Sequence, residues 1–164
     1  MLRWIAAAAL VAACGSDRQT GTAESHMSTF HLKPNSNAPS IAVTMAVPST
    51  WTAAPDQPVF TLPGLDGGRI TLAALELKGD ESERIQTAIE LQYGEGDAAK
   101  DAQRTELSGG RVWMERKELR MIHARVFVPY DRGVVMGVAL IPHAAAQRLP
   151  EIRRVFETLA VGAP

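Results

Sequence analysis

From residue 40 onward, apolar and polar residues alternate in a way that predicts a series of β-strands. In the segment 41–47, Ile41, Val43 and Met45 fall on one side and small or polar residues separate them, as in a half-buried strand. The same pattern predicts strands at 59–62, 69–77, 103–107, 111–118, 121–128 and 134–141. Glycine-containing turns at 65–68, 108–110 and 130–133 separate several of them.

Two other segments repeat with the period of a helix. Asp80 and Glu83 form the pattern of a capping box at the start of a helix expected at 81–93. The apolar stripe of this helix comprises Ile85, Ala88, Ile89 and Gln92. A second helical segment is expected at 144–159, interrupted or bent near Pro150. Its stripe comprises Leu149, Ile152, Val155, Phe156 and Leu159.

The order strands, helix, strands, helix, joined by short connections, predicts the α+β class. We expect a single domain, residues 41–160, in which an antiparallel β-sheet of about six strands packs against two main helices. No internal repeat and no second domain is expected.

The first residues have the layout of a secretory signal. Arg3 precedes an apolar run at 4–13, and small residues lead up to Cys14, the single cysteine of the chain. This run is too short for a transmembrane helix, which needs about 20 apolar residues. The alternatives are a buried helix, a signal cut to leave a free thiol, and a start at Met27 behind a segment, 25–28, that resembles a cloning junction.

The segment Val11-Ala12-Ala13-Cys14 resembles the bacterial lipobox. The resemblance implies that residues 1–13 are a signal peptide, and that Cys14 becomes the N-terminus and carries three acyl chains, palmitate among them. Gly15 and Ser16 lack the aspartate that resembles an inner-membrane retention signal. The expected location is therefore the outer membrane, facing the periplasm.

Residues 14–40 are polar and rich in Ser, Thr, Asn, Gly and Pro. We interpret them as a lipidated flexible tether with an average span of roughly 25–30 Å. The alternation at 29–33 leaves a short edge strand as a second interpretation of that part.

Charge and cysteine content exclude several classes of partner. The chain has 17 Lys and Arg against 18 Asp and Glu. Removal of 1–13 takes away only Arg3, which leaves 16 against 18 and a net charge of −2. No strong field of either sign results, so neither nucleic acid nor anionic lipid is an expected partner from net charge. Acylation of Cys14 would leave no thiol, so the domain needs an ordinary hydrophobic core.

The element order and three local phrases resemble the PsbP-like superfamily. The phrases are Val43 to Trp51, Gly109-Gly110-Arg111-Val112-Trp113 and Val155 to Leu159, within a resemblance that spans about residues 40–160. The resemblance implies an α/β/α sandwich, and a role in binding or assembling protein complexes rather than in catalysis. It transfers no ligand-binding motif to this sequence.

No catalytic pattern stands out. The four histidines, His26, His31, His123 and His143, do not pair at metal-ligand spacing. There is no Gly-x-Ser-x-Gly nucleophile motif, and no glycine-rich segment has the form of a phosphate-binding loop. We therefore predict no enzyme activity, no metal and no cofactor.

The remaining candidate is a surface for an envelope protein partner. Trp113 and Phe127 lie among charges on neighbouring predicted strands, and Arg111 and Arg125 are expected on the same side. Together these four residues form a candidate partner-binding patch. The alternative is that a helix covers both aromatic residues, which would make them core.

The function expected from the sequence is that of a membrane-anchored periplasmic lipoprotein with a non-catalytic binding or assembly domain. The first alternative is a carrier of a small ligand or lipid, which requires an apolar cavity. The second is an enzyme whose site is assembled from distant loops.

Overall fold

The computed structural model describes residues 24–54, 57–94 and 101–162. The predicted signal peptide, Cys14 and the first part of the predicted tether lie outside these residues.

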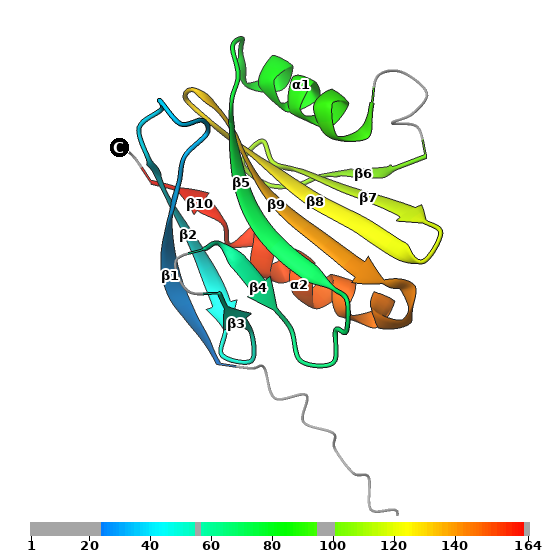
Figure 1. Ribbon diagram of the computed structural model, residues 1–164. Coiled ribbons are helices and arrows are strands. Elements are labelled where there is room, and N and C mark those ends of the chain that lie inside the picture. Colours follow the sequence, from blue (N-terminus) through cyan, green and yellow to red (C-terminus); the bar gives the residue numbers. More distant parts are fainter. Residues whose placement is uncertain (1–23, 55–56, 95–100, 163–164) are drawn as a thin grey trace, which may run out of the picture.

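An antiparallel sheet of seven strands forms the centre of the described structure (Figure 1). Its order is β3-β4-β5-β9-β8-β7-β6. The strands are β3 (Thr52–Ala53), β4 (Val59–Thr61), β5 (Arg69–Glu76), β6 (Gln103–Glu106), β7 (Val112–Glu118), β8 (Met121–Tyr130) and β9 (Gly133–Pro142). Apart from the two-residue strand β3, each was predicted within a few residues. The α+β class is confirmed.

A smaller sheet contains three strands in the order β1-β2-β10. They are β1 (Ser25–Leu32), β2 (Ile41–Pro48) and β10 (Ala160–Val161). All eight residues of β1 pair with β2, so the tether prediction was wrong for this segment. This segment forms a strand because Ser28, Phe30 and Leu32 alternate with more exposed residues and turn toward the core. The folded domain therefore begins well before residue 41.

The first helix, α1 (Glu81–Tyr93), has the predicted bounds. The backbone N–H of Glu83 donates to the Asp80 carboxylate over 2.9 Å, and the backbone N–H of Asp80 donates to the Glu83 carboxylate over 2.9 Å. This confirms the capping box, which satisfies N–H groups that have no partner inside the helix.

The second helical segment is divided in two. A 3₁₀ helix, η2 (His143–Arg148), precedes α2 (Leu149–Glu157). Pro150 lies in the first turn of α2, where its missing N–H has no cost. Pro150 therefore begins α2 rather than bending it, and of the two predicted alternatives near Pro150 the structure shows the interruption.

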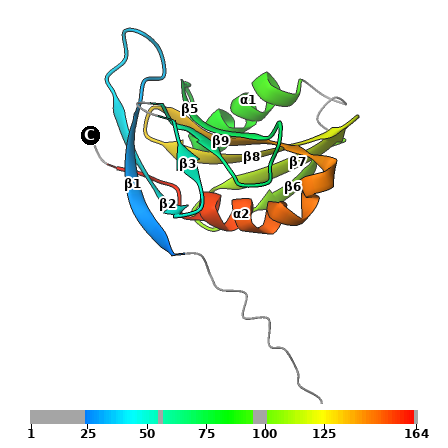
Figure 2. The same cartoon turned by 60° about the horizontal axis from the view of Figure 1, so that its bottom comes forward.

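The helices α1 and α2 cover opposite faces of the large sheet (Figure 2), and each encloses its own apolar layer. In the layer under α1, the helix residues Ile85, Ala88 and Ile89 pack against residues of β7, β8 and β9. Under α2, the larger layer joins the big sheet to the small one, with Val43, Phe60 and Phe156 at its centre. This is the sandwich arrangement expected from the sequence.

Candidate functional site

Trp113 and Phe127 do not form the predicted surface patch. Trp113 is 1% exposed and Phe127 is 0% exposed. In the register of β7 and β8, Val112 pairs with Phe127 and Trp113 pairs with Val126. Each pair joins an odd-numbered residue to an even-numbered one, so Trp113 and Phe127 lie on opposite faces. The patch prediction is corrected, and both aromatic residues are core, as the alternative proposed.

The two faces hold these aromatic residues in different layers. Phe127 packs in the layer under α1. Trp113 packs in the layer under α2, with its ring centroid 6.2 Å from that of Phe156. The indole N–H of Trp113 donates to the Glu115 carboxylate over 2.6 Å, which supplies the partner that a buried indole needs.

Arg125, the third residue of the predicted patch, lies against Tyr93 at the end of α1. Its guanidinium carbon is 4.7 Å from the centroid of the Tyr93 ring, and that of Arg116 is 5.0 Å away. Burial raises the pKa of the Tyr93 phenol, and Arg125 and Arg116 oppose that rise. These cation–π contacts stabilise the last turn of α1 on the sheet.

Arg111, the fourth residue, borders a groove at the seam between the two sheets. We call this the seam groove, formed by residues 39–41, 109, 111, 128–132 and 160–162. Its volume is about 880 Å³. The walls come from the start of β2, from β10, from the end of β8 and from the turn before β7. Four segments distant in the sequence therefore meet at one concave surface.

The seam groove combines apolar walls with cationic groups. Pro39, Pro129 and Val161 contribute apolar surface that is not buried in the core. Arg111 and Arg132 contribute guanidinium groups. Nη1 of Arg111 donates to the backbone carbonyl of Glu157 over 2.5 Å. Within the described residues this is the single hydrogen bond of the Arg111 side chain. A guanidinium has five N–H donors, so Arg111 is positioned by α2 and retains donors for a ligand.

Tyr130 also lines the seam groove. Its hydroxyl donates to the backbone carbonyl of Leu75 over 3.3 Å. Burial raises the pKa of the Tyr130 phenol, and the nearby Arg132 opposes that rise. The phenol is therefore neutral at physiological pH, and the charges in the groove are those of Arg111, Arg132 and Asp131.

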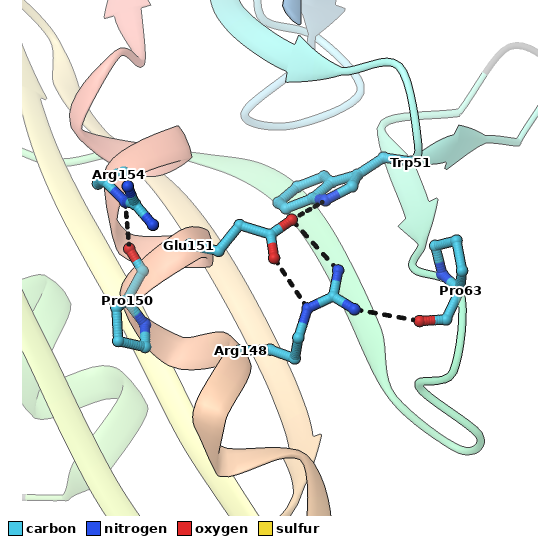
Figure 3. Close-up of polar contacts among 6 residues, drawn as sticks. All are labelled: Trp51, Pro63, Arg148, Pro150, Glu151 and Arg154. Carbon is cyan, nitrogen blue, oxygen red and sulfur yellow. Dashed lines mark hydrogen bonds and ion pairs between the residues drawn. The ribbon is translucent and has the colours of Figure 1, made fainter. Parts of the chain in front are cut away.

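A second polar cluster joins α2 to two loops (Figure 3). The Glu151 carboxylate accepts from the Trp51 indole N–H over 3.1 Å and from Nε of Arg148 over 2.8 Å. Nη1 of Arg148 also donates to the Pro63 carbonyl over 3.3 Å. Nearby, Nε of Arg154 donates to the Pro150 carbonyl over 3.2 Å. The Glu151 carboxylate and the Arg148 guanidinium pair with each other, so this cluster has a structural role and holds α2 against the two loops.

This cluster was not predicted from the sequence. The three-residue spacing of Arg148 and Glu151 on one helix face could have indicated their ion pair. Nothing in the local sequence indicates that Trp51 completes it, because that contact spans the domain.

Within the part of the chain that the structure describes, no group of three or more His, Cys, Asp and Glu side chains is placed to hold a metal ion. No helix of residues 24–54, 57–94 and 101–162 is both long and apolar enough to cross a membrane.

Neither a protein-family model nor a curated protein matches the sequence. Among solved structures, the chain is similar to the solution structure of cyanobacterial PsbP (CyanoP) from Synechocystis sp. PCC 6803, with a TM-score of 0.49 and 10% sequence identity. The likeness covers 91% of this chain and 99% of that chain.

Proposed function

We propose that this chain is a lipid-anchored protein of the bacterial cell envelope that binds an amphipathic anion in the seam groove and catalyses no reaction. The observation that carries the proposal is the groove itself. Its volume of about 880 Å³ falls in the range of ligand sites, roughly 300–1,000 Å³. This favours the carrier of a small ligand or lipid over the assembly module first expected from the sequence.

The chemistry of the groove defines the class of ligand. Pro39, Pro129 and Val161 would cover a hydrocarbon chain, because burial of apolar surface is favourable. Arg111 and Arg132 would receive a carboxylate or phosphate, since charged hydrogen bonds to these groups are strong. A fatty acid or the headgroup end of an anionic lipid has both parts.

The lipobox-like segment ending at Cys14 supports the envelope location. The PsbP-like phrases in the sequence, including 109–113 at the groove, support a binding role rather than a catalytic one. Attachment at Cys14 would hold the groove near the membrane, where amphipathic anions are found.

The test is a calorimetric titration of the full chain with dodecanoate and with dodecanol, which has the same hydrocarbon length and no charge. We expect dodecanoate to bind more tightly, and Arg111→Gln to weaken it by about tenfold or more, because a charged hydrogen bond contributes about 1.5–3 kcal/mol. Arg120→Gln, an exposed residue of the β7–β8 turn, is the matched control. Equal binding by wild type and Arg111→Gln would refute the proposed site.

A further inference from the structure

The strand β1 has one edge without a partner. All its residues pair with β2 on one side, and it is the outer strand of the small sheet. On the other side, no backbone group of the described residues hydrogen-bonds to 25–32. Figure 1 shows β1 along the outside of the molecule. Alternate N–H and C=O groups of β1 therefore point outward and can pair with another strand.

The other sheet edges are protected in ways that β1 is not. The edge strands β3 and β10 have two residues each. The edge strand β6 has four residues, and Arg104 and Glu106 on it form an ion pair of 2.8 Å. Short length and charge are the usual means of preventing strand addition. With eight residues, β1 contains no Lys, Arg, Asp, Glu or Pro.

The free edge is also rigidly held and partly apolar. Phe30 packs edge-to-face on Phe60, with ring centroids 5.2 Å apart. This contact fixes β1 against the core, so the edge is already ordered for pairing. On the outward side, Met27 is 64% exposed, one of three large hydrophobic residues so exposed in the described part of the chain.

We propose that β1 pairs antiparallel with β1 of a second copy, which joins two small sheets into one. When two copies of one strand pair about a two-fold axis, each residue faces a residue of the same strand in the other copy. Charged residues of like sign must therefore not face each other. Because β1 contains no Lys, Arg, Asp or Glu, it meets this condition. A pair centred on Thr29 places Thr29 opposite its own copy and Met27 opposite His31 of that copy, which are favourable or neutral combinations.

Cysteine cross-linking of the full chain tests this pairing. In a Cys14→Ser background, which removes the only native thiol, Thr29→Cys is compared with Leu91→Cys, an exposed position on α1 (62% exposed). Facing Cα atoms in paired strands are about 4.5–5.5 Å apart, within the span of a disulfide. We expect Thr29→Cys to form a disulfide-linked dimer at least about ten times faster than Leu91→Cys. Equal rates would overturn the proposal.

Sedimentation equilibrium provides a second readout that does not depend on cysteine chemistry. We expect the wild-type chain to form a dimer, and Thr29→Lys to weaken dimerisation by about tenfold or more, because like charges would face each other at the edge. Leu91→Lys should leave dimerisation unchanged. A wild-type chain that is monomeric at every concentration would contradict the proposal, as would capture of a different protein by the β1 edge.

Discussion

At the scale of single residues, Tyr93 shows what local sequence can and cannot indicate. The capping partners Asp80 and Glu83 are three residues apart, so their contact was predictable. Tyr93 instead meets Arg116 and Arg125, which come from β7 and β8. That contact depends on how the helix lies on the sheet, which the sequence pattern does not specify.

The raised pKa of the Tyr93 phenol leads to a prediction at alkaline pH. An unfolded chain ionises its tyrosines near pH 10, whereas buried Tyr93 resists ionisation. The stability that depends on neutral Tyr93 is therefore fully present below pH 10 and is lost as pH rises above it. In the variant Tyr130→Phe, which leaves Tyr93 as the single tyrosine, we expect phenolate absorbance to appear only above that pH.

The matched measurement uses urea unfolding. Tyr93→Phe should reduce the loss of stability above pH 10 more than Tyr130→Phe does, because Tyr93 is 3% exposed and Tyr130 is only half-buried. If Tyr93 ionised at or below pH 10, Arg116 and Arg125 would lower its pKa by at least as much as burial raises it, which would contradict this prediction.

At the scale of elements, period and turn signals predicted most strands but not their partners. The tether assignment of 25–32 was wrong because polar composition outweighed a real alternation. The strands β3 and β10, with two residues each, are too short to produce a pattern. The patch of Trp113 and Phe127 was wrong because the pairing register of β7 and β8, rather than the spacing within each strand, decides which faces they share.

The contact between α2 and the sheet gives a prediction at Gly137 of β9. A Cβ atom at Gly137 would lie 2.8 Å from the Phe156 ring, and Phe156 is fully buried. Gly137→Ala should therefore lower the free energy of unfolding by about 1–3 kcal/mol, as overpacking does. Gly162→Ala is the control, because its Cβ would meet Ala42 at an ordinary 3.5 Å. Urea unfolding of both variants checks this, and equal stability would show that α2 can move away freely.

At the scale of the whole molecule, the seam groove joins four segments that are far apart in the sequence. Arg111 was predicted to belong to a surface patch. The meeting of 39–41, 128–132 and 160–162 beside it could not be predicted from the sequence, because it depends on the packing of two sheets. The proposed function links this groove to a membrane through Cys14, which lies outside the described residues. The anchor is therefore a prediction of the sequence alone.

Metabolic labelling with a fatty-acid probe in bacterial cells tests the anchor most directly. Wild-type chain is compared with Cys14→Ser, which differs at the single cysteine. The account predicts that wild type is labelled and sediments with membranes, since several acyl chains give stable attachment, while Cys14→Ser carries no label. Equal labelling of both chains, or no labelling of wild type, would contradict the account.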